Sequence, residues 1–252
     1  MGGEPVKAWG ASDRGLARSG NEDAYFILPM GPDRLACGVA DGLGGFQAGE
    51  VAAALAIEVA QERIRQAWQG PENDSRAGAC LRTAIWEAHR RIRESGETEG
   101  WGPMASTLTL VALWPGGAAL GHVGDSRAYL YRDGELRQLT RDQSPVGEML
   151  WKGEITEAEA RSHPGRHLLD QAVGTGELEY VEEQSLTLQQ GDLILLCTDG
   201  LTAVVDPAEI ASVLSRHQPG QAPQRLIALA NRRGGPDNVT VVVAEVGWED
   251  TR

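Results

Sequence analysis

The sequence predicts an α+β fold in which two packed antiparallel sheets carry helices on their outer faces. Strand-like segments come first, two helical segments follow, more strands come next, and helices and one strand close the chain. Because strands and helices do not alternate, a doubly wound parallel sheet is not expected. With 252 residues, 41% of them hydrophobic, the chain has the size and composition of one large domain. We expect a single domain over residues 1–252, with its core at about 9–246.

The first elements are two short strands and a helix. Residues 25–28 and 35–40 are apolar runs, and the turn-forming segment 29–33 separates them, which is typical of strands. From residue 49 to 68 the pattern becomes helical, because one face of the segment carries Val51, Leu55 and Val59.

A second helix is predicted after the break at residues 70–74. Asp74 or Ser75 is expected to cap it, because short polar side chains accept hydrogen bonds from the first free N–H groups of a helix. Its core-facing residues recur at spacings of three and four: Leu81, Ala84, Ile85, Ala88 and Ile92.

The central part of the chain predicts an antiparallel meander. Residues 107–114, 118–123 and 128–132 have strand character, and turn signals lie at 115–117 and 133–134. The polar segment that follows is expected to form a flap at about 144–175, with a short helix near 156–160.

The C-terminal part is expected to add strands at 179–187 and 193–197. Asp206-Pro207-Ala208-Glu209 predicts a helix start, with a capping carboxylate, proline at the first position and a glutamate in the first turn. A last helix at about 221–231 and a strand at 239–246 complete the chain.

Composition excludes several classes of function. The net charge of −13 argues against a nucleic-acid binder, which would present a basic face. The N-terminus has no apolar run typical of a signal peptide, and no apolar stretch is long enough to span a bilayer. Cys37, Cys80 and Cys197 are far apart in apolar surroundings, so buried reduced thiols are expected rather than disulfides or a zinc site. These features predict a cytoplasmic protein.

Four aspartates share one setting, because each ends an apolar strand beside a glycine or a turn residue: Asp41, Asp125, Asp199 and Asp237. A further acidic cluster, Asn21-Glu22-Asp23, precedes the strand at Tyr25. Taken alone, each Asp-Gly pair is most often a turn. Together, carboxylates at one sheet edge would repel one another, so their convergence implies a cation. Oxygen ligands without a Cys or His cluster favour Mg2+ or Mn2+ over zinc.

Two such ions about 3.5–4 Å apart can activate a bridging water and clamp a phosphoryl group. Gly42 would let a backbone carbonyl approach an ion without obstruction. Arg18 is a candidate phosphate clamp because a guanidinium matches phosphate oxygens bidentately, although its chemistry fits a surface arginine equally well.

Six short motifs occur along the chain in the order found in one family. They are Arg18-Ser19-Gly20-Asn21-Glu22-Asp23, Asp41-Gly42-Leu43-Gly44-Gly45 with Gly49-Glu50, Ser106-Thr107, Gly124-Asp125-Ser126-Arg127, Thr198-Asp199-Gly200-Leu201 and Asp237-Asn238. The chain resembles the metal-dependent protein phosphatases of type 2C, the PPM family, and especially their compact bacterial members. The resemblance runs from about Trp9 to Val246. It implies a four-layer αββα sandwich, with two antiparallel sheets flanked by helix pairs.

The resemblance also implies one shared role, holding Mn2+ or Mg2+, for seven residues: Glu22, Asp23, Asp41, Gly42, Asp125, Asp199 and Asp237. Asp41 would bridge both ions, and Gly42 would contribute its carbonyl. The pair Glu22-Asp23 would lie near the second ion. Asp125 with Asp199 would hold a weaker third ion.

By the same resemblance, Arg18 would bind phosphate, and with Asp41 and Asp199 it would form the catalytic set, while Asn238 accompanies Asp237. The implied activity is hydrolysis of phosphoserine and phosphothreonine in proteins by a water that bridges the two ions. The implied partners are a bacterial Ser/Thr kinase and its targets, with no nucleic acid and no membrane. A monomer is expected.

Two departures from the family pattern matter. Leu43 stands where animal members carry a histidine proposed as general acid and many bacterial members carry methionine. Leu43 cannot donate a proton, so water would have to protonate the leaving alkoxide. In addition, Asp142-Gln143-Ser144 replaces the usual bacterial Asp-His-Ser, which removes a ligand or hydrogen-bond partner near the flap.

Two other functions are compatible with the sequence. A non-catalytic member of the family would keep the fold to bind a phosphopeptide, although such a scaffold has no evident need for so many repelling carboxylates. A phosphatase for small phosphorylated molecules is also compatible, because specificity lies in the flap and the surface.

Overall fold

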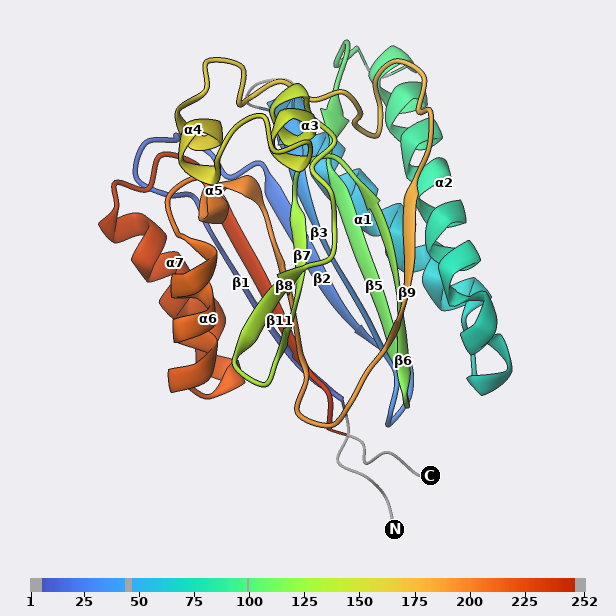
Figure 1. Ribbon diagram of the computed structural model, residues 1–252. Coiled ribbons are helices and arrows are strands. Elements are labelled where there is room, and N and C mark those ends of the chain that lie inside the picture. Colours follow the sequence, from blue (N-terminus) through green and yellow to red (C-terminus); the bar gives the residue numbers. More distant parts are fainter. Residues whose placement is uncertain (1–5, 44–46, 99, 248–252) are drawn as a thin grey trace.

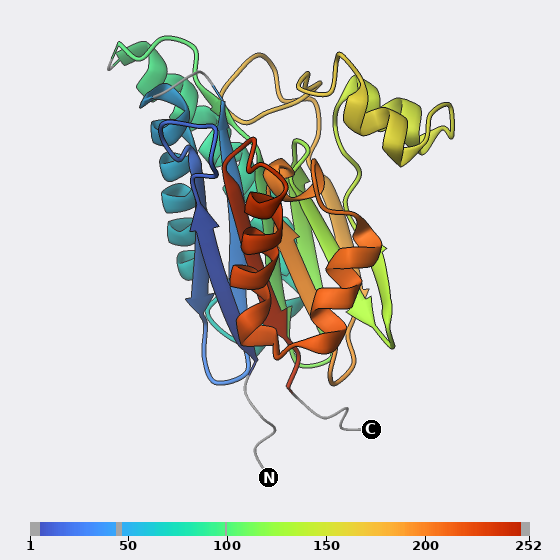
Figure 2. The same ribbon diagram turned by 90° about the vertical axis from the view of Figure 1, so that its left-hand side faces the viewer.

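The computed structural model, which describes residues 6–43, 47–98 and 100–247, confirms the predicted sandwich. Two antiparallel sheets face each other, and a pair of helices covers the outer face of each (Figures 1 and 2). Gly44 and Gly45 of the second motif lie outside the described residues, as do both ends of the predicted domain.

The first sheet has the strand order β2-β3-β5-β6-β9. Its strands are β2 (Asp23–Pro29), β3 (Leu35–Leu43), β5 (Leu108–Trp114), β6 (Gly117–Val123) and β9 (Glu182–Thr187). The short β4 (Ala105–Ser106) pairs with the end of β3. The β9 strand begins three residues later than the predicted segment, which started at Glu179.

The second sheet has the order β1-β11-β10-β7-β8. Its strands are β1 (Lys7–Asp13), β11 (Val239–Glu245), β10 (Leu193–Cys197), β7 (Arg127–Arg132) and β8 (Glu135–Gln138). The outer strand β1 joins the sheet by pairing with β11, from the opposite end of the chain.

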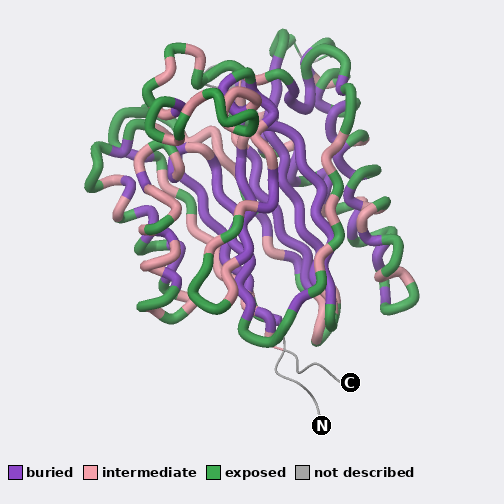
Figure 3. The backbone as a smooth tube through the Cα atoms, viewed as in Figure 1, coloured by how far each residue is buried: buried purple, intermediate pink, exposed green. Residues whose placement is uncertain are grey.

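Alternation along the strands builds three cores. In β3, Cys37 and Val39 face the second sheet, whereas Ala36 and Ala40 face the helices α1 (Gln47–Ala67) and α2 (Ala77–Thr98). On the second sheet, the inner face carries residues such as Leu196, and the outer face packs against α5 (Asp199–Thr202), α6 (Pro207–Arg216) and α7 (Ala222–Arg232). The central strands, such as β5, β6 and β10, are therefore buried on both faces, whereas the edge strands β1, β8 and β9 are partly exposed (Figure 3).

The predicted three-stranded meander is wrong in one respect. The β5 and β6 strands form the expected hairpin, but β7 leaves that sheet and pairs with β10 in the other. The turn at 133–134 then joins β7 to β8. The crossing from β6 to β7 runs through Gly124-Asp125-Ser126, so Asp125 lies where the chain passes between the sheets.

The predicted cap of the second helix is also wrong. Residues Pro71–Arg76 form a 3-10 turn, η1, and α2 begins only at Ala77. The Asp74 carboxylate instead accepts hydrogen bonds from the Arg34 guanidinium, at 2.8 and 3.1 Å, and from the Trp68 indole, at 3.0 Å. By contrast, the predicted helix start at Asp206-Pro207 is confirmed, with a capping box that includes Glu209. The last helix follows the short 3-10 turn η2 (Pro219–Gln221).

The flap segment stands at the end of the sandwich where β7 begins (Figure 1). It contains the predicted short helix, α4 (Glu157–Ser162), which Thr156 caps. It also contains a helix that was not predicted, α3 (Pro145–Trp151), which Ser144 caps.

The three cysteines are free thiols, as predicted, but only Cys37 and Cys197 are buried, and Cys80 is partly exposed. Among the described residues, no helix combines the length and the apolar character needed to cross a membrane.

Candidate functional site

Two of the predicted aspartates meet where β2 and β3 pair. Asp23 and Asp41 are register partners on neighbouring antiparallel strands, so their side chains lie on the same face. The hydroxyl of Thr198, which directly follows β10 of the other sheet, donates a hydrogen bond to Asp23 Oδ2 at 2.8 Å. The two carboxylates therefore lie in the space between the sheets, at their common end.

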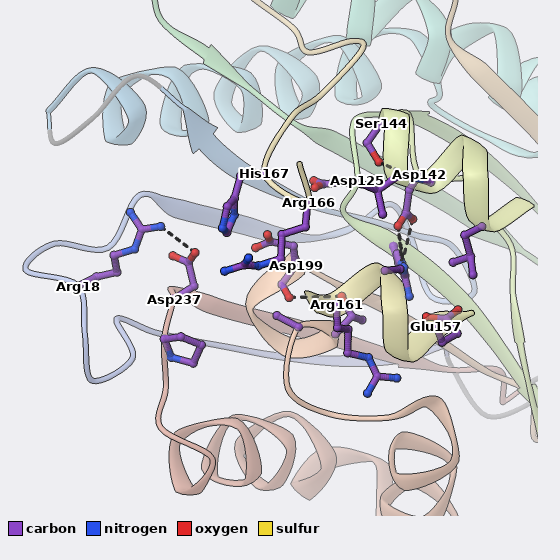
Figure 4. Close-up of a pocket in the computed structure, with 18 residues that line it drawn as sticks. Arg18, Asp125, Asp142, Ser144, Glu157, Arg161, Arg166, His167, Asp199 and Asp237 are labelled. Atoms are coloured by element: carbon purple, nitrogen blue, oxygen red, sulfur yellow. Dashed lines mark hydrogen bonds and ion pairs between the residues drawn. The ribbon is translucent and has the colours of Figure 1, made fainter. Parts of the chain in front are cut away.

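The other three aspartates reach the same end from connecting segments. Asp125 lies in the crossing from β6 to β7, Asp199 opens α5 directly after β10, and Asp237 precedes β11. All three line a cavity of about 350 Å³ beneath the flap (Figure 4). The structure thus brings together the five predicted aspartates.

Burial and mutual repulsion raise the pKa values of four of these carboxylates. Burial, followed by the charges of Asp199 and Asp237, raises the pKa of Asp23 to about 7, although hydrogen bonds from Thr240 and Thr198 lower it. Burial, and then the charge of Asp23, raises the pKa of Asp41 well above its ordinary value. The pKa values of Asp125 and Asp199 are raised by burial and by their acidic neighbours.

The arrangement fits a hard divalent cation. Asp23 Oδ1 is buried and has no hydrogen-bond partner within the described part of the chain, so this oxygen can bind an ion. At Gly42, a side chain would overlap the Gly49 carbonyl, so the backbone there is packed more closely than any other residue allows. Among residues 6–43, 47–98 and 100–247, no group of three or more Asp, Glu, His or Cys side chains is placed to hold a metal ion as it stands. The fit rests on the type of donor instead, because Mg2+ and Mn2+ prefer carboxylate and carbonyl oxygens.

Glu22 and Asn238 position the loop that leads into β2. The Glu22 carboxylate lies against Gly49 in the first turn of α1, where an anion is favoured by the helix dipole. The Glu22 N–H donates to Asn238 Oδ1 at 2.8 Å, and Asn238 Nδ2 donates to the carbonyls of Arg14 and Gly20 at 2.9 and 2.8 Å. Asn238 therefore ties this loop to the segment that carries Asp237.

Arg18 lies at the rim of the carboxylate cluster. Its side chain is 51% exposed, and its Nη2 donates to Asp237 Oδ2 at 2.8 Å (Figure 4). The guanidinium is therefore held beside the site while much of its donor surface faces solvent. Such a group can bind an anion that enters the cavity.

The structure adds residues that the sequence did not single out. Arg166 and His167, from the flap, line the same cavity as Asp199. The apolar part of the lining includes Val146 and Leu150 of α3. No spacing in the sequence signals these residues, because only the folded flap brings them over the strand ends.

A family model described as "Protein phosphatase 2C" matches residues 17–229 of the chain. The chain is 40% identical over 238 residues to the serine/threonine protein phosphatase PstP of Mycobacterium tuberculosis, which covers 93% of this chain but only 44% of that protein. It thus spans less than half the length of this relative. It is also 31% identical over 246 residues to the protein phosphatase PhpP of Streptococcus pneumoniae, covering 95% of this chain and 97% of that one.

The fold has a close match among solved structures. The catalytic domain of serine/threonine protein phosphatase PstP in complex with two manganese ions superposes with a TM-score of 0.83 at 37% identity, covering 95% of this chain and 97% of that one.

Proposed function

Because this chain belongs to the protein phosphatase 2C family, we propose that it is a metal-dependent phosphatase that hydrolyses phosphoserine and phosphothreonine in proteins. The observation that carries this proposal is the convergence of five aspartates at one end of the sandwich, where three of them line a cavity with Arg18 at its rim. Carboxylates that raise one another's pKa, one with a buried oxygen free of any partner, are poorly explained by a structural role alone.

The residues proposed to hold Mn2+ or Mg2+ are those named above: Glu22, Asp23, Asp41, Gly42, Asp125, Asp199 and Asp237. Bound ions would neutralise the carboxylates, activate a water nucleophile and polarise the phosphoryl oxygens. The protein fixes Asp41 through its backbone, since the Asp41 N–H donates to Thr107 Oγ1 and the Ser106 hydroxyl donates to the Asp41 carbonyl, both at 2.9 Å. Two ions are proposed, with a weaker third at Asp125 and Asp199.

Arg18 is proposed to bind the substrate phosphate through its exposed N–H groups. Leu43, the last residue of β3, carries no titratable group, so water rather than a side chain at this position is proposed to protonate the leaving alkoxide. The proposed substrates are proteins phosphorylated by a Ser/Thr kinase in the cytoplasm, and the proposed working form is a monomeric single domain.

The test is phosphate release from a phosphothreonine peptide, measured with Mn2+ and with EDTA, alongside Asp199→Ala. Turnover that requires the metal and is lost in the variant is the expected result. Sugar phosphates serve as the comparison, because faster turnover of those would assign the enzyme to small molecules. Mn2+ binding without any turnover would instead favour a phosphopeptide-binding scaffold.

Arg18→Ala is expected to raise KM for the peptide about tenfold or more, since a hydrogen bond to a charged group contributes about 1.5–3 kcal/mol. Mn2+ affinity, measured by calorimetry, is expected to be unchanged or higher, because Asp237 loses its ion-pair partner. Arg14→Ala is the matched control, since this exposed arginine lies in the same loop and its guanidinium donates to the Ser19 carbonyl rather than to an aspartate of the cluster. A collapse of Mn2+ binding in Arg18→Ala would show that the assigned role is wrong.

A further inference from the structure

Gln143 stands at the point where the chain enters the flap, defined here as residues 144–175. It is the residue that replaces histidine in the bacterial pattern, and it is only 5% exposed. All four of its polar groups are used. Its N–H donates to the Gly124 carbonyl at 2.8 Å, and its Oε1 accepts from the Gly124 N–H at 3.0 Å. Its Nε2 donates to the His122 carbonyl at 3.4 Å, and its carbonyl accepts from the Asp170 N–H at 2.9 Å.

Through Gly124, these bonds reach the Asp125 loop, defined as residues 124–126. Gly124 has φ +110°, and a side chain there would lie 2.6 Å from the Thr107 methyl group, so the loop is pressed against Thr107. The Thr107 hydroxyl shares a 2.8 Å hydrogen bond with Ser126 and accepts from the Asp41 N–H. Asp125 is therefore held between two residues that both contact Thr107, the residue that fixes Asp41.

The C-terminal end of the flap is hydrogen-bonded to the same residues. Asp170 donates to Gln143, and Val173 pairs with Ser106 through two backbone hydrogen bonds of 2.9 Å. The Ser106 hydroxyl in turn donates to the Asp41 carbonyl. The two ends of the flap are thus bonded to the Asp125 loop and to Ser106 of β4, which holds the Asp41 backbone.

We propose that Gln143 is a positioning residue that fixes the Asp125 loop and joins it to both legs of the flap, so that cation binding at Asp125 and ordering of the flap occur together. The proposal rests on the proposed metal-dependent function. The expected size of the effect follows from metal sites in general: removing residues that orient a metal ligand through hydrogen bonds commonly weakens metal binding by about 10–100-fold.

Gln143→Met tests the proposal, because methionine keeps the length of the side chain and removes both amide groups. The matched control is Gln171→Met. Gln171 is also buried, at 8% exposure, and its Oε1 also accepts backbone N–H groups, from Glu179 and Tyr180, but none from the Asp125 loop. Mn2+ calorimetry and amide hydrogen exchange are measured for the wild-type protein and both variants.

Gln143→Met is expected to weaken the weakest Mn2+ binding event at least about tenfold and to speed exchange in both the Asp125 loop and the flap. Gln171→Met is expected to match the wild type in Mn2+ binding. Equal Mn2+ affinity in Gln143→Met and the wild type, or equal weakening in both variants, would overturn the proposal. A wild-type protein that binds no Mn2+ would overturn the proposed function instead.

A second measurement uses the wild-type protein alone and tests the same proposal if Gln143→Met does not fold. When Mn2+ is added to the wild-type protein, exchange of the amides of Gly124, Gln143 and Asp170 is expected to slow in parallel. Slowing at Gly124 without any change at Asp170 would show that the flap is not joined to the Asp125 loop through Gln143.

Discussion

Asp41→Asn is expected to lower the Mn2+-dependent turnover of a phosphothreonine peptide at least about a thousandfold, which corresponds to about 4 kcal/mol of transition-state stabilisation. The same substitution is expected to raise the melting temperature of the metal-free protein. The two effects have opposite signs because the Asp41 charge is unfavourable when no cation is present: burial and the charges of Asp23 and Asp199 raise its pKa.

Asparagine is the suitable replacement because it preserves the local structure. The hydrogen bonds that hold the Asp41 backbone do not depend on the charge of its side chain. The Asp41 N–H donates to Thr107 Oγ1, and the Asp41 carbonyl accepts from the Ser106 hydroxyl. The change therefore isolates the carboxylate. Mn2+ is expected to raise the melting temperature of the wild-type protein, because a ligand that binds only the folded state stabilises it, and to raise that of the variant much less.

The measurements are peptide turnover and thermal unfolding, each with EDTA and with Mn2+. Asp133→Asn is the control, because this residue lies in the β7–β8 turn at φ +52°, a conformation that asparagine also adopts readily. An Asp41→Asn protein with the full Mn2+ shift, or with a lower melting temperature in EDTA, would contradict the assigned role.

The carboxylate cluster was predictable because each member carries a local signal. Asp41 lies near the end of β3, Asp199 follows β10 and Asp237 precedes β11, and strand ends in a sandwich meet at a few edges. The contacts between motifs have no such signal. The Glu22 N–H donates to Asn238 Oδ1, and Asn238 Nδ2 donates to the Gly20 carbonyl, so these bonds join residues more than 200 positions apart.

The same distinction applies to the fold. The helix start at Asp206-Pro207 depends on its own neighbours, so the sequence predicts it correctly. The start of α2 depends on tertiary contacts, because Arg34 and Trp68 take the Asp74 carboxylate that was expected to cap it. Turn residues indicate where a chain reverses, but they do not indicate which sheet the next strand joins, so the crossing of β7 was missed. The β1 strand was missed because Lys7–Asp13 is only partly apolar and depends on pairing with β11.

The second large effect is expected from an ion pair beside the site. Asp142→Ala is expected to lower the free energy of unfolding by about 3–5 kcal/mol, because it leaves the Arg127 guanidinium buried without its counter-ion. The side chains of Arg127 and Asp142 are 10% and 13% exposed, and three hydrogen bonds of 2.7 to 3.1 Å join them.

Urea unfolding in EDTA measures this cost without any contribution from bound metal. The surface pair between Arg90 and Glu94 is the control: its distance of 2.8 Å is similar, but its side chains are 59% and 48% exposed. Glu94→Ala is expected to cost less than about 0.5 kcal/mol, because solvent screens such helix pairs. The double variant Arg127→Met/Asp142→Leu is expected to recover most of the loss, since it removes both buried charges together. If Asp142→Ala cost no more than Glu94→Ala, burial would not be the source of the effect, and the Arg127–Asp142 pair could not be regarded as a structural support of the Asp125 loop.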